Sequence, residues 1–189
     1  MKKFSIIAAA FLLLSSAGFA QTWNWDKAHS QLNFGITHMT INEIDGTFGT
    51  VSATLTSSKD DFSDAVVELT ADVNSINTGV EQRNTHLKSD AFFDAAKFGT
   101  LTFKSTSFKN VGGKNYQVTG DLTLHGVTKT VTLNAVLNGT VQNQQKKTVA
   151  GFKVTGSIKR TDFGIAPGFP ATAISDDVML NANAEFVKS

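Results

Sequence analysis

The stretch YQVTGDLTLHGVTKTVTLNAVL, residues 116–137, consists of two runs in which apolar and polar residues alternate, separated by His125-Gly126. Alternation with a period of two is typical of antiparallel strands that bury one face. A polar residue followed by glycine favours a tight turn between two such strands. The stretch therefore predicts a β-hairpin whose apolar side chains lie on one side of a sheet.

The same alternation recurs along most of the chain. Further strands are expected at six runs, residues 32–38, 51–56, 65–73, 101–103, 152–158 and 178–186. Further turns are expected at four pairs, Asp45-Gly46, Gly112-Gly113, Asn138-Gly139 and Pro167-Gly168. About eight short strands at this spacing predict an all-β sandwich or barrel.

Residues 79–97 depart from the strand pattern. Thr78 and Glu81 have the spacing of a capping box, in which a hydroxyl and a carboxylate satisfy exposed amides at the start of a helix. Ser89 or Asp90 is available to begin a second helix. The segment therefore predicts one or two short helices that cross over between the third and fourth strands.

The first twenty residues have the parts of a secretory signal. Lys2 and Lys3 supply positive charge, residues 6–14 are apolar, and Gly18 and Ala20 are small residues at the right distance from a cut after Ala20. The apolar run is too short to cross about 30 Å of hydrocarbon, and no second apolar segment follows it. The predicted organisation is a signal peptide at 1–20, one domain at 21–189, and no integral membrane segment after cleavage.

The overall charge excludes some partners. The chain has 17 Lys and Arg against 16 Asp and Glu, a net charge of +1, and no cluster of basic residues. This balance argues against a nucleic-acid partner. The absence of cysteine rules out disulfides and thiol chemistry, so stability must come from packing and backbone pairing.

The choice of aromatic residue bears on what a barrel of this kind contains. The chain has 15 Phe and one Tyr. Eight strands close into a barrel that is either filled by side chains or holds one small ligand. Phenylalanine offers apolar area without a polar group, which suits a lining for alkyl or prenyl chains. It also suits a packed core, and composition by itself favours the core.

Several longer sequence motifs point to a family. They include Asp26-Lys27-Ala28-His29-Ser30, Arg83-Asn84-Thr85-His86-Leu87, the block from Gly120 to Lys129, and Arg160-Thr161-Asp162-Phe163-Gly164. With these motifs the chain resembles the YceI-like family of exported bacterial proteins over about residues 22–187. It departs from the family pattern at Asn84, where an acid is frequent, and at Phe98-Gly99, where Tyr-Pro is frequent.

The resemblance implies a fold and a function. The fold is an extended, lipocalin-like antiparallel eight-stranded β-barrel with a short helical crossover at about 79–97. The function is binding and carriage of a polyisoprenoid, an isoprenoid quinone or a fatty-acid derivative in the barrel interior. The resemblance together with the signal implies a periplasmic location, and the resemblance makes a homodimer possible. No cofactor is expected.

The inward faces of the expected strands and helices supply candidate binding residues. Those expected to line a lipid tunnel are Phe34, Ile36, Phe48, Phe93, Phe103, Leu122, Leu124, Leu133, Phe152, Val154 and Phe163. His38, Arg83 and His86 are expected at a polar mouth, where they would meet a phosphate or carbonyl headgroup. For Arg83 and His86 a helix-to-barrel salt bridge is the alternative, and for Arg160 and Asp162 an ion pair that closes the barrel is expected.

Catalysis and metal binding find little support in the sequence. The four histidines lie on different expected elements and lack the spacing of metal ligands, so no metal is predicted. Asp26, His29 and Ser30 are neighbours on one segment, whereas a catalytic triad is assembled from separated residues. The prediction is a binding protein and not an enzyme. Two alternatives stay open: an enzyme or stress-response factor that acts on a bound isoprenoid near His38, and a non-lipid interaction domain with a packed core.

Overall fold

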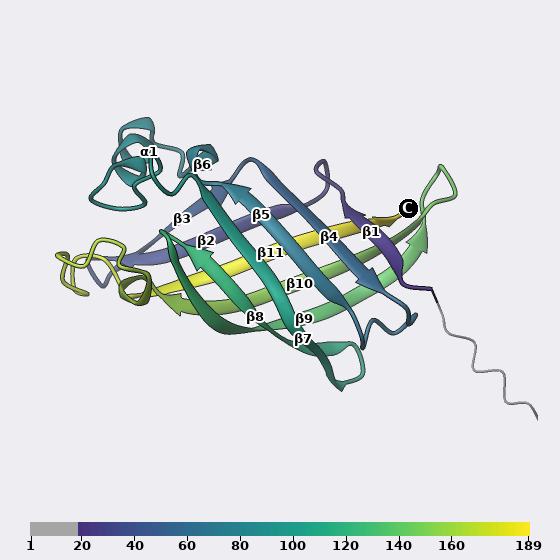
Figure 1. Ribbon diagram of the computed structural model, residues 1–189. Coiled ribbons are helices and arrows are strands. Elements are labelled where there is room, and N and C mark those ends of the chain that lie inside the picture. Colours follow the sequence, from purple (N-terminus) through teal and green to yellow (C-terminus); the bar gives the residue numbers. More distant parts are fainter. Residues whose placement is uncertain (1–18) are drawn as a thin grey trace, which may run out of the picture.

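Eleven antiparallel strand segments form one sheet that closes on itself in the computed structural model, which describes residues 19–189 (Figure 1). Their bounds are β1 (Gln21–Trp25), β2 (Gln31–His38), β3 (Asn42–Phe48), β4 (Val51–Ser57), β5 (Val66–Asp72), β6 (Ile76–Asn77), β7 (Thr100–Gly112), β8 (Asn115–Leu124), β9 (Val127–Gln142), β10 (Thr148–Lys159) and β11 (Asp177–Lys188). One α-helix, α1 (Glu81–Lys88), and two 3₁₀ turns, η1 (Val73–Ser75) and η2 (Arg160–Phe163), complete the described elements. The predicted signal peptide, apart from its last two residues, falls outside the described range.

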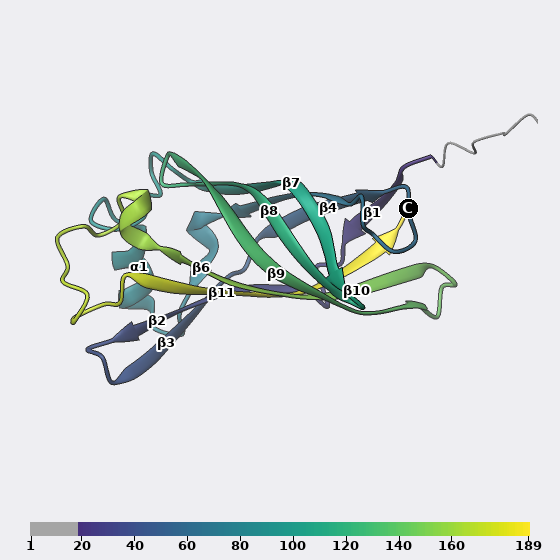
Figure 2. The same ribbon diagram turned by 90° about the horizontal axis from the view of Figure 1, so that it is seen from below.

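The closed circuit has eight strands and confirms the expected lipocalin-like barrel. It runs β1-β4-β5-β7-β8-β9-β10-β11, and β1 pairs with both β4 and β11. The long strand β11 also pairs with β2 along residues 179–183 before it reaches β1. A smaller flap, β2-β3-β6, thus extends the sheet at the end where α1 lies, as Figure 2 shows from below. In residues 19–189, no helix has the length and apolarity needed to cross a bilayer.

The hairpin predicted over residues 116–137 is present. β8 and β9 pair in register as far as Leu124 and Val127, with His125 and Gly126 between them. Both turn residues have positive φ, 52° and 72°, as a two-residue hairpin turn of type I′ requires. A side chain at position 126 would also collide with the ring of Phe98, 2.4 Å from the Cβ position.

Two of the predicted turns are wrong, because Asp45-Gly46 lies inside β3 and Asn138-Gly139 lies inside β9. Gly46 is opposite Phe34, and a Cβ at this position would lie 2.2 Å from the Phe34 ring. The glycine therefore makes room for a ring on the neighbouring strand and does not reverse the chain. Gly139 pairs with Gly151 on β10, where the register of the β9–β10 ladder shifts between Gly151 and Phe152. Pro167-Gly168 lies at a turn, and Gly113 begins the turn that follows Gly112, the last residue of β7.

The helical crossover is shorter than expected. α1 begins at Glu81, and Val80 at its N-cap makes no side-chain hydrogen bond, so the predicted capping box is wrong. The Thr78 hydroxyl instead donates to Asn84 Oδ1 at 2.8 Å, and this amide oxygen also accepts from the Thr78 backbone. The predicted second helix is replaced by two turns, which are separated by Asp94 with φ of 43°.

Candidate ligand cavity

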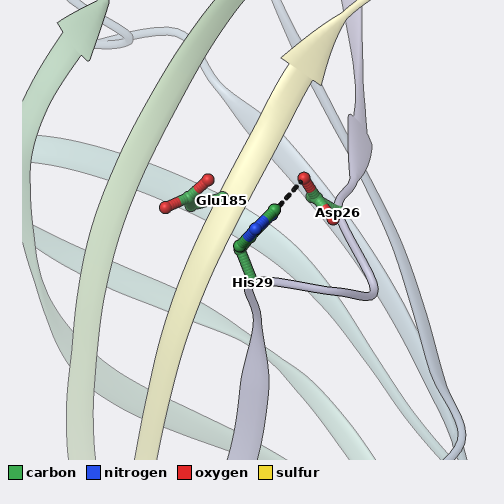
Figure 3. A group of neighbouring side chains, drawn as sticks. All are labelled: Asp26, His29 and Glu185. Atoms are coloured by element: carbon green, nitrogen blue, oxygen red, sulfur yellow. Dashed lines mark hydrogen bonds and ion pairs between the residues drawn. The ribbon is translucent and has the colours of Figure 1, made fainter. Parts of the chain in front are cut away.

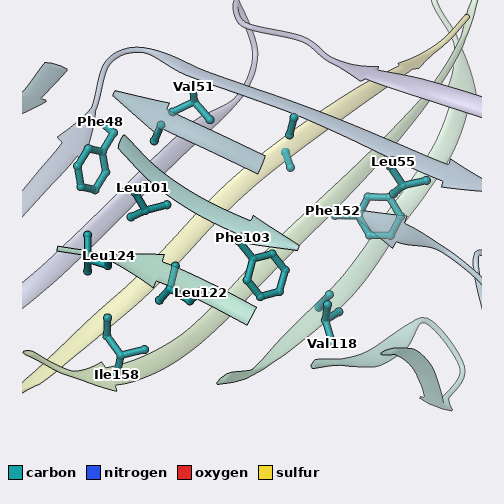
Figure 4. Packing of buried hydrophobic residues seen from close by; sticks show 14 of the residues in the cluster. Phe48, Val51, Leu55, Leu101, Phe103, Val118, Leu122, Leu124, Phe152 and Ile158 are labelled. Carbon is teal, nitrogen blue, oxygen red and sulfur yellow. The ribbon is translucent and has the colours of Figure 1, made fainter. Parts of the chain in front are cut away.

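The barrel encloses an apolar cavity of about 460 Å³, within the range of small-molecule sites. Ten of the eleven residues predicted to line a tunnel do line it: Phe34, Ile36, Phe48, Phe93, Phe103, Leu122, Leu124, Leu133, Phe152 and Val154. Figure 4 shows several of them pointing from different strands into the same interior. The alternating faces of the strands therefore meet around a space, and binding by these residues remains a prediction.

Phe163 is the exception, and its predicted place in the lining is wrong. Its side chain is 1% exposed but does not contact the cavity. β10 ends at Lys159, and the 3₁₀ turn η2 that follows breaks the period of two. Phe163 therefore packs beside the barrel end, where its carbonyl lies 3.0 Å from His125 Nδ1.

The three predicted mouth residues, His38, Arg83 and His86, all line the cavity. Arg83 donates through Nε to the Thr78 hydroxyl at 2.8 Å and through Nη2 to the Thr78 carbonyl at 2.7 Å. A guanidinium has five N–H donors, so three are left for another partner. Across residues 19–189 neither Arg83 nor His86 forms an ion pair, so the alternative of a helix-to-barrel salt bridge is wrong.

Arg160 also lines the cavity, and it does not form the predicted ion pair with Asp162. It is 5% exposed, and η2 replaces the strand that would have placed the two side chains on one face. Its five N–H groups donate to backbone carbonyls of Ile165, Ala166, Phe169, Ile174 and Ser175. Arg160 therefore ties down the loop of residues 164–176, which connects η2 to β11.

Contacts place these ionisable side chains at one end of the barrel. The ring of Phe92 lies 4.8 Å from His86 and 5.3 Å from Phe169, measured between centroids. Arg160 donates to the Phe169 carbonyl at 2.7 Å, and His38 forms a β-bridge to the same loop. None of the described lining residues is Asp or Glu. The charged side chains of the lining are therefore basic, and they gather at the mouth.

Five further aromatic residues line the two ends of the cavity without having been predicted from the sequence. Phe92 and Phe169 line the mouth from turns, where no periodicity marks a face. Trp25, Phe108 and Phe186 line the opposite end. These three lie on strands, so their alternation with polar neighbours was an available signal.

A second group of polar side chains lies outside the cavity, where ligand atoms of Asp26, His29 and Glu185 come within 4.8 Å of one another (Figure 3). His29 Nδ1 lies 2.9 Å from Asp26 Oδ2. The Ser30 hydroxyl donates to the Glu185 backbone carbonyl at 3.3 Å and does not join the other two residues in a triad. The hydrogen bond between His29 and Asp26 raises the pKa of His29 and lowers the pKa of Asp26.

This pair predicts a pH-dependent stability. A histidine whose pKa is raised by folding stabilises the fold fully below its ordinary pKa of 6.5, and this contribution is lost as the pH rises through the raised value. We expect the melting temperature to fall as the pH rises above about 6.5 and His29→Gln to flatten that fall. Asp26→Asn serves as the partner control and is expected to flatten it equally. An unchanged pH profile in both variants would contradict the prediction.

Comparison with known proteins gives a consistent result. A family model described as YceI-like domain matches residues 23–186. Protein YceI of Salmonella newport is 38% identical over 159 residues, covering 83% of each chain. The crystal structure of a Campylobacter jejuni YceI protein has a TM-score of 0.74 and 29% identity, covering 100% of this chain and 99% of the other. A polyisoprenoid binding domain from Saccharophagus degradans shares the fold, with a TM-score of 0.64 at 21% identity, covering 88% and 98%.

Proposed function

Because the chain belongs to the YceI-like family, we propose that it is a carrier that holds one long-chain amphiphile with its tail in the barrel cavity. The proposed cargo is a polyisoprenoid, an isoprenoid quinone or a fatty-acid derivative. The observation that carries the proposal is the cavity of about 460 Å³, with apolar walls and with its basic groups gathered at one end. The polyisoprenoid binding domain from Saccharophagus degradans, which shares the fold, adds support.

Burial of the tail supplies the affinity. Each methylene that moves from water to an apolar lining contributes up to about 0.8 kcal/mol. A tail of fifteen to twenty carbons therefore contributes up to about 12–16 kcal/mol, against an association cost of about 4–15 kcal/mol. Such a carrier shields a chain that cannot cross an aqueous compartment alone, and it needs no catalytic group to do so.

The headgroup is proposed to lie at the mouth, beside His38, Arg83 and His86. The basic character of the lining favours an anionic or electron-rich group such as a phosphate, a carboxylate or a quinone carbonyl. Arg83 has three N–H donors beyond those it gives to Thr78, so it is the side chain best placed to bind an oxyanion.

Arg83→Gln is expected to lower affinity for an amphiphile with a phosphate or carboxylate head about tenfold, because one charge-assisted hydrogen bond is lost. Affinity for the alcohol with the same tail is expected to change little. Trp25 lines the cavity, so its fluorescence reports tail entry in both titrations. Arg83→Lys, which keeps the charge, is the control and is expected to retain part of the difference. Equal losses for the acid and the alcohol would contradict a role in headgroup binding.

We further propose that the protein is exported to the periplasm after cleavage of residues 1–20. The first strand begins at Gln21, so cleavage after Ala20 would leave every described strand in the mature protein.

One experiment tests both parts of the proposal. Native mass spectrometry of the protein from the periplasm of an exporting bacterium, with lipid extraction of the same sample, gives the mature mass, the oligomeric state and the cargo. We expect a chain that starts at Gln21 and carries a prenyl or acyl compound. An apo mass that is unchanged after incubation with quinones, polyprenyl phosphates and fatty acids would overturn the carrier function. A periplasmic chain that retains Met1 would overturn cleavage, and absence of the protein from the periplasmic fraction would overturn export.

A further inference from the structure

Opposite the mouth, aromatic side chains close the barrel. The cluster contains Trp23, Trp25, Phe62, Phe108, Tyr116, Phe152 and Phe186. Phe152 lies at its centre, with ring centroids 5.3 Å from Phe62, 6.2 Å from Phe108 and 6.3 Å from Phe186. Figure 4 shows Phe152 well away from Phe48.

The cluster has two layers. Trp25, Phe108, Phe152 and Phe186 contact the cavity, whereas Trp23, Phe62 and Tyr116 are buried behind them and do not. Phe152 therefore has the cavity on one side and Phe62 on the other, in edge-to-face contact with an interplanar angle of 83°. The rings of Trp25, Phe108, Phe152 and Phe186 therefore border the cavity at this end and form its floor.

The second layer is held in place by a built loop, residues 58–65. Phe62 has φ of 56°, which is unfavourable for a bulky residue, yet its side chain is only 2% exposed. The Asp64 carboxylate accepts from the Ser57 hydroxyl at 2.6 Å and from the Ser58 amide at 3.0 Å. The Tyr116 hydroxyl donates to the Asp61 carbonyl at 2.6 Å. These contacts hold the loop in place, and Phe62 packs behind Phe152 and supports the floor from that side.

We infer that Phe152, supported by Phe62, is a stop that limits the length of tail the barrel accepts. The inference rests on the proposed function, because it assigns chain-length selectivity to the same cavity. A headgroup bound at the mouth and a closed floor fix both ends of the ligand. A tail shorter than the distance between them leaves apolar wall uncovered, and a longer tail displaces the headgroup from its partners. Phe152 is thus a specificity-determining residue.

The test is a series of saturated fatty acids of about 12 to 22 carbons, titrated against the full mature chain. Each additional methylene that is buried in the cavity raises the affinity about fourfold. The chain length that binds best is therefore the length at which the tail reaches the floor. Phe152→Ala is expected to move this optimum to longer chains. Ala184→Leu is expected to move it to shorter chains, because Ala184 lies opposite Phe152 on β11 and also lines the cavity.

Phe48→Ala is the matched control. Phe48 is 7% exposed and Phe152 is 3% exposed, and both line the cavity, but Phe48 packs against Phe34 and Phe93, away from the floor. Its truncation is expected to lower affinity across the series and leave the optimum unchanged. If Phe152→Ala does not fold, Phe62→Ala, which leaves Phe152 in place without its support, and Ala184→Leu decide the question.

The outcomes separate the two claims. Opposite shifts in Phe152→Ala and Ala184→Leu, with no shift in Phe48→Ala, support the stop. In a second outcome, the wild-type protein binds the series while the folded variants Phe152→Ala, Phe62→Ala and Ala184→Leu keep the same optimum chain length. That result overturns the stop and leaves the carrier function standing. A wild-type protein that binds no member of this series or of a polyprenyl phosphate series overturns both.

Discussion

Leu133→Glu is expected to weaken binding of any long tail by about 100-fold or more while the barrel stays folded. Leu133 lies on β9, lines the cavity and is only half-buried, since its side chain faces open interior space. A carboxylate at this position can be hydrated in the empty cavity, but an entering tail would strip that water away. The corresponding loss of at least about 2.7 kcal/mol is at the low end of the cost of burying an uncompensated polar group.

Thr132→Glu is the matched control for this change. Thr132 precedes Leu133 on the same strand and is exposed on the outer face of the barrel. It receives the same charge, so any effect on net charge or on strand propensity appears in both variants. Binding is followed through Trp25, and folding is checked by circular dichroism and melting temperature. A folded Leu133→Glu protein that binds like Thr132→Glu would show that the tail lies elsewhere.

The sequence predicts the interior well wherever strands are regular. Along β8 and β9 each inward side chain follows from the period of two, and for this reason Leu122, Leu124 and Leu133 were correctly placed around the cavity. The same reasoning fails at Phe163, because the 3₁₀ turn η2 replaces the strand after Lys159. No residue in that segment has a sequence signal that predicts the end of the strand.

Glycine shows a second limit of sequence reasoning. Asp45-Gly46 has the composition of a hairpin turn, yet the pair lies within β3. The requirement that selects glycine there is the ring of Phe34 on the adjacent strand, a neighbour in space that lies outside the local sequence. The actual reversal uses Met39 and Thr40, both with positive φ, where composition gives no turn signal.

The floor and the loop at the mouth could not be predicted for a related reason. Phe62 stands among polar loop residues, so nothing local distinguishes a buried plug from an exposed aromatic. Arg160 and Asp162 suggested an ion pair, whereas the partners of Arg160 are five backbone carbonyls. Carbonyl groups occur at every residue, so their convergence on one side chain leaves no trace in the amino-acid sequence.

Arg160→Met is expected to destabilise the protein by about 3–5 kcal/mol. Methionine is similar in length but has no N–H group, so up to five carbonyls of the loop at residues 164–176 lose their donor. Each buried acceptor left unpaired costs about 1–3 kcal/mol, and relaxation of the loop keeps the total below the sum. The variant is therefore expected to melt about 10 °C lower than the wild type. The amides of residues 164–176 are expected to lose most of their protection from hydrogen exchange.

Lys159→Met separates this effect from a general loss of charge. Lys159 is the neighbouring residue, and it forms exposed ion pairs with Asp176 and Asp177, which contribute little to stability because solvent screens them. Equal melting temperatures for the two variants would contradict the organising role of Arg160. Because Phe169 and Ile174 from the same loop line the cavity, Arg160→Met is also expected to bind its cargo more weakly. Arg160 has no free N–H group for a headgroup, so that loss is expected to be equal for acids and alcohols, unlike the loss in Arg83→Gln.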